Sequence, residues 1–365
     1  MKNNILIIGS TGKLGSKLLN FCYKQSIKID AIICKNNIKK LLVQKEKYNV
    51  RKYFCISNSQ HINDFNNYIK TTSLKIIYFL DYGSNSLKTL DLILKNQNFS
   101  YIAIANKEML IAGSSLLIKK IKQSQNYFIP LDSEHFSLLN SNLKNDLIDS
   151  VYITASGGPF FFNKKIDLNS VNKKQVLSHP KWKMGLNNLI DSSNFINKLL
   201  EIYELSSIFE IDINKINFVI SREAFIHSII LYKDSTIALN CFDNDMLIPL
   251  VKPLSLCFDV SYKINSRKIY LKKSFDLRKK LDMRFKIFRY FNKLILLPHS
   301  ERIKFMILNN KAQKLYLENK LQYNMILDYI ISRLDFKQKG IQLNTFHKIT
   351  NYIYSLENSL WKIFH

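Results

Sequence analysis

Three glycines that follow a short apolar segment, near the beginning of the chain, constrain the fold of this sequence more than any other feature. Residues 4–8 read NILII, and the next residues read GSTGKLG, with Gly9, Gly12 and Gly15 evenly spaced. The segment SKLLNFCYKQ that follows is typical of a helix. A buried parallel strand, a glycine turn and a helix predict a dinucleotide site, because glycines let a pyrophosphate approach the helix N-terminus. A tight turn without a ligand is the alternative.

Alternating strand-like and helix-like segments continue along the chain. Core strands are expected at residues 28–34, 74–80, 101–105 and 127–131, with a helix at 86–95. Further strands are expected at residues 150–154, 216–220, 225–232 and 235–239, and apolar periodicity predicts helices from about Arg284. The predicted fold class is α/β. We expect a Rossmann-like NADPH-binding domain (1–130), an α+β catalytic and connective domain (131–262), a linker (263–283) and a small helical C-terminal domain (284–365).

The end of the second expected strand bears on the choice of cofactor. An NAD site normally has an acidic residue there, which binds the ribose hydroxyls. Lys35 and Asn36 occupy that position in this chain. Because a cation favours a 2′-phosphate, the sequence predicts NADP rather than NAD. Lys35 as an ordinary surface lysine is the alternative.

Polar tripeptides follow two of the expected strands, where open parallel sheets place their ligands. NKE (106–108) follows one strand, and DSE (132–134) follows another. On an extended segment, Asp132 and Glu134 would point to the same face. Two acids on one face favour a hard cation such as Mg²⁺ or Mn²⁺. A helix N-cap at Asp132 or Ser133 with ordinary surface acids is the alternative.

Two later segments are also unusually polar for this chain. ASGGPF (155–160) offers Ser156 and the amides of Gly157 and Gly158 as an anion-binding nest. The loop that follows carries His179, Trp182 and Met184, and such large side chains suit a flap that closes over a substrate. A small satellite core is the alternative interpretation of that loop.

A helix is expected from Asp191 and Ser192, which would form its N-cap, to about Leu205. Within it, Asn197, Lys198 and Glu201 are spaced so that they share one face. A solvated helix face is the alternative for these three side chains.

The charge and cysteine content limit the partners of the chain. The formal net charge is +26, from 54 basic and 28 acidic side chains, which by itself would indicate nucleic acid. However, Lys, Asn, Ile and Phe are frequent everywhere, basic residues form no tail, and lysine outnumbers arginine, so a biased genome composition explains the charge better. The five cysteines are scattered and no apolar run reaches the ~18 residues of a membrane span. We therefore expect a cytoplasmic protein without a membrane or nucleic-acid partner.

Taken in order, GSTGKLG, ANKE, PLDSEH, TASGGPF, HPKWKMG and DSSNFINKLLE resemble the 1-deoxy-D-xylulose 5-phosphate reductoisomerase family. The motifs cover about residues 1–246, and the C-terminal third is similar in helical character only. The resemblance implies an NADPH- and divalent-metal-dependent enzyme of non-mevalonate isoprenoid synthesis. Such an enzyme converts 1-deoxy-D-xylulose 5-phosphate to 2-C-methyl-D-erythritol 4-phosphate, and the family resemblance also implies a homodimer.

The resemblance further implies roles for residues of this chain. Metal ligands, for Mg²⁺ or Mn²⁺, would be Asp132, Glu134 and Glu201. NADPH would contact Thr11, Gly12, Lys13 and Leu14 at its pyrophosphate, Lys35 and Asn36 at its 2′-phosphate, and elsewhere Asn106, Glu108 and Gly185. The phosphorylated sugar would contact Lys107, Ser133, Glu134, His179 and Glu201, with Ser156, Ser192, Asn197 and Lys198 at its phosphate and Trp182 and Met184 in the flap. Lys107, Asp132, Glu134, His179 and Glu201 would be the catalytic residues.

The chain also departs from the family pattern. Residues 220–224 read ISREA where the family usually has a His-Pro segment, so Ser221 replaces a histidine. Leu186 replaces a basic residue after the Met-Gly pair, and residues 308–313 only loosely resemble the family's Asn-Ala-Ala-Asn-Glu run. These departures indicate sequence drift, so a relative that binds NADPH without turnover is one alternative. The others are an NADP-dependent semialdehyde or homoserine dehydrogenase and a basic nucleic-acid-binding protein.

Overall fold

The computed structural model describes residues 4–96, 99–180, 184–259, 261–264, 276–278 and 282–362. These residues form two compact units, each made of two stretches of chain. The first unit comprises Met1–Leu139 and Asp245–Arg267, and the second comprises Asn140–Asn244 and Lys268–His365. The four domain ranges expected from the sequence stay a prediction. Within the described ranges, no helix has the length and apolar character needed to cross a bilayer.

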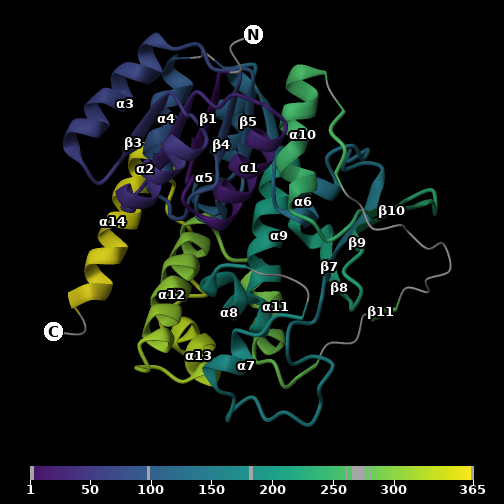
Figure 1. Cartoon of the computed structure of the whole chain (residues 1–365). Coiled ribbons are helices and arrows are strands. Elements are labelled where there is room, and N and C mark those ends of the chain that lie inside the picture. The colour runs from purple at the N-terminus through teal and green to yellow at the C-terminus, as the bar shows by residue number, and fades with distance from the viewer. Residues whose placement is uncertain are drawn as a thin grey trace. The chain divides into compact units, whose positions relative to one another are not determined.

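The first unit is built on a parallel sheet with the strand order β3-β2-β1-β4-β5-β6 (Figure 1). Its strands are β1 (Ile5–Ile8), β2 (Ala31–Cys34), β3 (Lys52–Cys55), β4 (Ile76–Phe79), β5 (Tyr101–Ile104) and β6 (Tyr127–Pro130). Its helices are α1 (Lys13–Lys24), α2 (Ile38–Lys47), α3 (Ser59–Thr71), α4 (Ser86–Asn96), α5 (Lys107–Gln123), α6 (Ser133–Ser137) and α10 (Leu247–Phe258). The reversal of strand order at β1 and β4 is the point at which doubly wound sheets bind ligands.

The core of the first unit includes a helix that arrives late in the sequence. α10 lies beside α1 and packs on β4 and β5. Leu250, Val251 and Leu254 of α10 are buried in the same apolar cluster as Ile5 and Leu18. In addition, the buried Tyr78 hydroxyl donates a hydrogen bond of 2.9 Å to the carbonyl of Leu250. The first unit is therefore complete only with its second stretch of chain.

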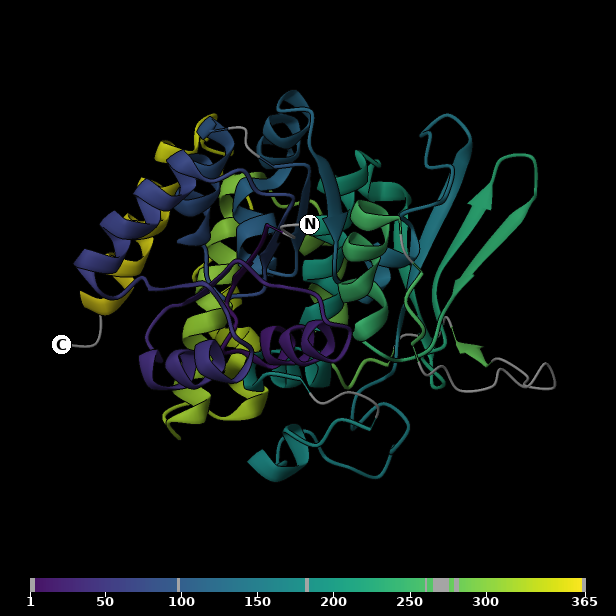
Figure 2. The same ribbon diagram turned by 45° about the horizontal axis from the view of Figure 1, so that its top comes forward.

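The second unit contains a mixed sheet with the strand order β10-β9-β7-β8-β11. Its strands are β7 (Ile148–Ala155), β8 (Ile216–Ser221), β9 (Ile226–Tyr232), β10 (Ile237–Cys241) and β11 (Leu277–Arg278). β7 and β8 are parallel, whereas β9 pairs antiparallel with both β7 and β10. Figure 2 shows β9 and β10 as a long hairpin, whose tip includes Ser235 at a left-handed φ of 67°.

Helices make up the rest of the second unit. They are α7 (Lys173–Val176), α8 (Leu186–Asn194), α9 (Ile196–Phe209), α11 (Ile287–Ile295), α12 (His299–Leu317), α13 (Ile326–Ile331) and α14 (Phe346–Lys362), with two 3₁₀ turns at Ile213–Lys215 and Tyr323–Met325. The expected fold class, α/β with C-terminal helices, is confirmed.

The expected single helix from Asp191 to about Leu205 is wrong. Asp191 and Ser192 lie inside α8, and the chain breaks at Phe195, which has a left-handed φ of 67°. A bulky residue rarely adopts this conformation without tertiary support. The Phe195 ring is buried, with its centroid 4.8 Å from that of Phe285 and 5.1 Å from that of Phe288. This aromatic packing stabilises the left-handed conformation of Phe195 that separates α8 from α9. No local sequence pattern predicts it.

Candidate active site

The glycine turn has the close backbone packing that a dinucleotide-binding turn needs. Gly9 has a φ of 86°, and a Cβ added to Gly15 would come within 2.5 Å of the Gly9 carbonyl oxygen. Gly12 is the N-cap of α1, whose first turn has neither a side-chain cap nor an acidic residue. The α1 N-terminus therefore suits an anion, and it carries the predicted cofactor residues Thr11, Gly12, Lys13 and Leu14.

A buried polar network that sequence reasoning missed fixes this turn. The Ser10 hydroxyl donates to the Gln44 amide oxygen at 2.9 Å, and the Gln44 amide donates back to the Ser10 carbonyl at 2.9 Å. Gln44 is buried although it belongs to α2, a helix with few other buried residues. Nothing in the local sequence distinguishes Gln44 from a surface residue.

Basic side chains surround the outer part of the turn. Lys35 and Asn36 are exposed directly after β2. Lys40, on α2, places its Nζ 2.6 Å from the Thr11 carbonyl oxygen. Sequence reasoning missed Lys40, since one lysine among 54 basic residues gives no signal. Together Lys35 and Lys40 give this end of β2 the positive charge that a phosphate requires.

A second polar network lies after β4 and β5. The Asn106 amide donates to Asp81 Oδ1 at 3.1 Å and to the Gly83 carbonyl at 3.0 Å, while its oxygen caps α5. Burial raises the pKa of Asp81 and of Glu108 above the ordinary values of aspartic and glutamic acid. Asp81 was missed, although it follows an expected strand just as Asn106 does.

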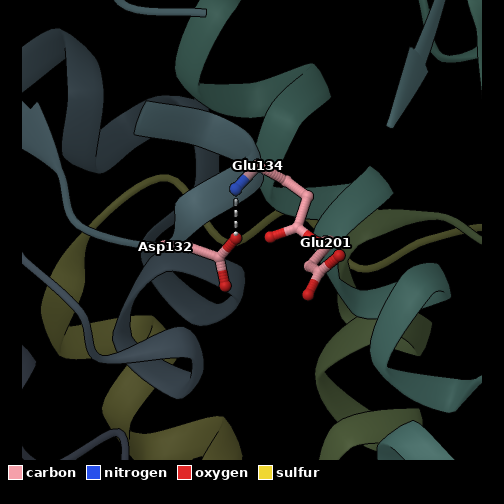
Figure 3. A group of neighbouring side chains, drawn as sticks. All are labelled: Asp132, Glu134 and Glu201. Carbon is pink, nitrogen blue, oxygen red and sulfur yellow. Dashed lines mark hydrogen bonds between the residues drawn. The ribbon is translucent and has the colours of Figure 1, made fainter. Parts of the chain in front are cut away.

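The geometry expected for Asp132 and Glu134 is wrong, because this segment is not extended. Asp132 is the N-cap of the short helix α6, and Glu134 lies in its first turn. The Glu134 amide donates to Asp132 Oδ1 at 3.2 Å, the bond marked in Figure 3. Lys107 Nζ lies 2.7 Å from Asp132 Oδ2, and the Ser133 hydroxyl donates to Glu134. The segment is therefore a helix N-terminus with two acids and a lysine gathered on it.

Glu201 belongs to the second unit, where it lies on α9 with the two neighbours that the spacing predicted. Lys198 Nζ is 2.5 Å from Glu201 Oε2, and the Asn197 amide donates to Glu201 Oε1. Lys198 and Glu201 are both buried. Figure 3 draws Glu201 with Asp132 and Glu134, the three acids that are candidates for metal ligands. Three carboxylates without a sulfur or imidazole ligand form a donor set that suits Mg²⁺ or Mn²⁺.

The turn after β7 contributes Ser156 and Gly158 to the lining of a pocket of about 670 Å³ in the second unit. We call it the Ser156 pocket; its lining includes Ser156, Gly158, Phe162, Ser178, His179 and Arg222. Gly158 has a φ of 57°, and a Cβ there would come within 2.7 Å of the Ser192 carbonyl oxygen. The turn therefore brings the backbone of Gly158 close to Ser192, one of the residues that the resemblance assigns to the phosphate.

His179 lines this pocket in its neutral form. Its Nε2 lies 3.1 Å from the Ser156 hydroxyl oxygen. Burial, and secondarily the charge of Lys198, lower the pKa of His179 from 6.5 to about 4. At neutral pH the ring is therefore uncharged. One of its nitrogens can donate a hydrogen bond and the other can accept one.

The remaining predicted residues that the structure describes lie around α8. Trp182 is outside the described residues. Met184 and Gly185 directly precede α8, with Gly185 as its N-cap. Asp191, which was predicted as an N-cap, instead accepts hydrogen bonds from Asn309 at 2.9 Å and Gln313 at 2.5 Å, in the interior of the unit. The sequence predicted no role in the site for Asn309 and Gln313.

Comparisons with known proteins give one consistent result. The family model described as 1-deoxy-D-xylulose 5-phosphate reductoisomerase matches residues 5–93, and the model of its C-terminal domain matches residues 128–209. The curated 1-deoxy-D-xylulose 5-phosphate reductoisomerase of Pelagibacter ubique is 32% identical over 360 residues, which cover 90% of this chain and 89% of the relative. That of Clostridium novyi is 28% identical and covers 96% of this chain and 98% of the relative.

Solved structures share the fold along nearly the whole chain. A 1-deoxy-D-xylulose 5-phosphate reductoisomerase from Zymomonas mobilis in complex with NADPH has a TM-score of 0.81 at 19% identity, covering 98% of both chains. A reductoisomerase crystallised with NADPH, fosmidomycin and magnesium has a TM-score of 0.83 at 21% identity, covering 97% of this chain and 96% of the other.

Proposed function

This chain belongs to the 1-deoxy-D-xylulose 5-phosphate reductoisomerase family, and on that premise we propose how its own residues perform the reaction. The enzyme is an NADPH-dependent oxidoreductase and isomerase of isoprenoid biosynthesis. It rearranges 1-deoxy-D-xylulose 5-phosphate and reduces the product to 2-C-methyl-D-erythritol 4-phosphate. The cofactors are NADPH and a divalent metal ion, as in the relative crystallised with NADPH and magnesium.

Asp132, Glu134 and Glu201 are the proposed ligands of the metal ion. When bound, a divalent ion supplies Lewis acidity that stabilises negative charge on the substrate's oxygens. Two lysines of the protein offset part of the negative charge of these carboxylates, since Lys107 lies beside Asp132 and Lys198 lies beside Glu201. These lysines orient the carboxylates and contribute hydrogen-bond donors for the substrate, as do Ser133 and Asn197.

In this proposal most of the NADPH-binding residues belong to the first unit. Thr11, Gly12, Lys13 and Leu14 would hold the cofactor's pyrophosphate at the α1 N-terminus, and Lys35 and Asn36 would hold its 2′-phosphate. The absence of acids in the first turn of α1 and the proximity of Lys40 support this arrangement. Asn106, Glu108 and Gly185 contact other parts of the cofactor. When bound, NADPH supplies the hydride, and the protein positions it.

The substrate's phosphate binds in the Ser156 pocket. Ser156, Ser192, Asn197 and Lys198 hold it, with the amides of the glycine pair as further donors. His179 remains neutral at pH 7 and hydrogen-bonds Ser156. Because the phosphate does not react, its binding energy holds the reacting carbons in position. Trp182 and Met184 would contact the substrate from the flap that the sequence predicts.

The observation that carries the proposal is the acid–lysine pair within each unit: Asp132 lies beside Lys107 in the first unit, and Glu201 lies beside Lys198 in the second. The test is NADPH oxidation by the purified protein with 1-deoxy-D-xylulose 5-phosphate. We expect turnover only with Mg²⁺ or Mn²⁺, and inhibition by a phosphonate hydroxamate. Metal-independent turnover of a semialdehyde would instead identify a dehydrogenase, and the absence of any turnover would identify a relative that has lost activity.

We further propose a homodimer that acts in the cytoplasm and has no nucleic-acid partner. β10 is at an edge of its sheet, and Ile237 and Leu239 on it are 63% and 53% exposed. An apolar edge strand of this kind favours pairing with a second copy. Light scattering should give a dimer mass for the wild type and a monomer mass for the double variant Ile237→Lys, Leu239→Lys. A monomeric wild type would contradict the proposal.

A further inference from the structure

The turn between β8 and β9 brings an arginine to the Ser156 pocket. The Ala224 amide donates to the Ser221 carbonyl at 3.2 Å, which places Arg222 and Glu223 at the centre of a tight turn. Ala224 completes it with a left-handed φ of 51°. The backbone at Arg222 is thereby fixed, and the side chain lines the pocket together with Ser156 and His179.

An aromatic ring supports the guanidinium of Arg222. The guanidinium carbon lies 5.1 Å from the centroid of the Phe162 ring, within the range of a cation–π interaction. The Phe162 ring in turn packs against Gly157, where an added Cβ would come within 2.8 Å of it. Because Gly157 has no side chain, the Phe162 ring can pack against the proposed anion nest, and Arg222 lies over that ring.

The charge on Arg222 is available for a ligand. No carboxylate in the described part of the chain lies within ion-pair distance of it. A second arginine, Arg278, lies 5.4 Å from the centroid of the same ring but forms an ion pair of 2.6 Å with Asp276 and does not line the pocket. Among the residues that the structure describes, the pocket therefore has an unpaired guanidinium at its edge, whereas the second guanidinium on the ring is neutralised.

We propose that Arg222 is a further substrate-binding residue, whose guanidinium contacts the phosphate group of the substrate in the Ser156 pocket. The inference rests on the proposed function, which places that phosphate beside Ser156. A planar guanidinium can donate two parallel hydrogen bonds to phosphate oxygens. The residue belongs to the ISREA segment, residues 220–224.

The test compares Arg222→Gln with Arg278→Gln, which removes the same charge from the same ring. Each variant is assayed with NADPH and Mg²⁺ while the concentration of the sugar phosphate is varied, which gives both kcat and KM. Inhibition by inorganic phosphate is measured in parallel. We expect Arg222→Gln to raise both the KM and the inhibition constant of phosphate about tenfold, with little change in kcat. Arg278→Gln should stay within about twofold of the wild type, and Arg222→Lys should recover part of the loss.

The outcomes separate the inference from the proposed function. If the wild type turns over and Arg222→Gln has an unchanged KM, or if both glutamine variants shift equally, the inference is wrong while the function stands. If the wild type does not turn over, the proposed function fails, and calorimetry with inorganic phosphate still decides the role of Arg222: affinity must fall in Arg222→Gln and not in Arg278→Gln. Melting temperatures close to that of the wild type exclude misfolding as the cause.

Discussion

At the scale of single residues, the candidate site is built from side chains that have both a structural and a chemical task. Asp132 caps α6 by accepting a hydrogen bond from the Glu134 amide, and it also forms an ion pair with Lys107. From the sequence, capping the helix and binding a metal were alternative roles for Asp132. The two roles are compatible, because Oδ1 accepts the capping hydrogen bond while Oδ2 is left for a charged partner. Residue type and spacing could not show this, because the choice depends on where the chain turns after β6.

Glu201→Gln tests the metal site at a single position. The substitution removes one negative charge from the proposed donor set while keeping the shape of the side chain. We expect kcat to fall by about a hundredfold or more, and the metal concentration for half-maximal activity to rise. Steady-state kinetics across a Mg²⁺ titration measures both. Glu210→Gln, at the exposed end of the same helix, is the control, and near-normal kcat of Glu201→Gln at low metal would remove Glu201 from the ligand set.

His179 predicts a pH dependence of stability. Its pKa is lowered to about 4 in the folded protein, whereas the unfolded chain binds a proton near pH 6.5. Between these values the unfolded state binds more protons, so the free energy of unfolding falls as the pH falls from about 6.5 to about 4. His179→Gln should lose less stability over this window in urea titrations at pH 7.5 and pH 5. His347→Gln, at an exposed position, should behave like the wild type; equal losses in all three proteins would contradict the assignment.

At the scale of elements, local pattern predicted most of the strands and much less of the helix boundaries. The strands expected at residues 28–34 and 74–80 are observed at Ala31–Cys34 and Ile76–Phe79, because continuous apolar runs mark buried parallel strands. The α8–α9 break was missed because the aromatic rings that hold Phe195 come from residues about 90 positions later. Such long-range packing leaves no trace in a short window of sequence.

The glycine turn and α1 give a prediction at this scale. A Cβ at Gly15 would come within 2.5 Å of the Gly9 carbonyl oxygen, whereas a Cβ at Gly12 would be 3.3 Å from that atom. Gly15→Ala must therefore displace α1 from the turn, and we expect a loss of about 1–3 kcal/mol of stability. Gly12→Ala should keep its melting temperature but raise the KM for NADPH. Equal melting temperatures for the two variants would show that α1 can shift without cost.

At the scale of the whole molecule, both units are assembled from separate stretches of chain. Sequence reasoning expected consecutive domains, because composition and periodicity do not reveal that a helix returns to an earlier sheet. α10 is strongly apolar, but its packing partners Ile5, Leu18 and Tyr78 lie more than 150 residues earlier in the sequence. Only the three-dimensional arrangement identifies them.

The discontinuity predicts the behaviour of fragments. A fragment of residues 1–139 lacks Leu250, Val251 and Leu254, whose burial contributes about 5 kcal/mol by the area removed from water. It should therefore unfold at much lower urea concentration than the same fragment joined to residues 245–267 by a flexible linker. Circular dichroism measures both transitions. Leu250→Asp in the joined fragment should abolish the gain, and identical transitions with and without residues 245–267 would show that α10 is dispensable.

The late return of α10 also matters while the protein is being made. A ribosome adds about 5–20 residues per second, so roughly 5–20 s pass between the synthesis of residue 139 and that of residue 245. During this interval the nascent sheet lacks the helix that covers Tyr78 and its neighbours. The growing polypeptide thus exposes an apolar surface during each round of translation, and we expect ribosome-associated chaperones to bind it.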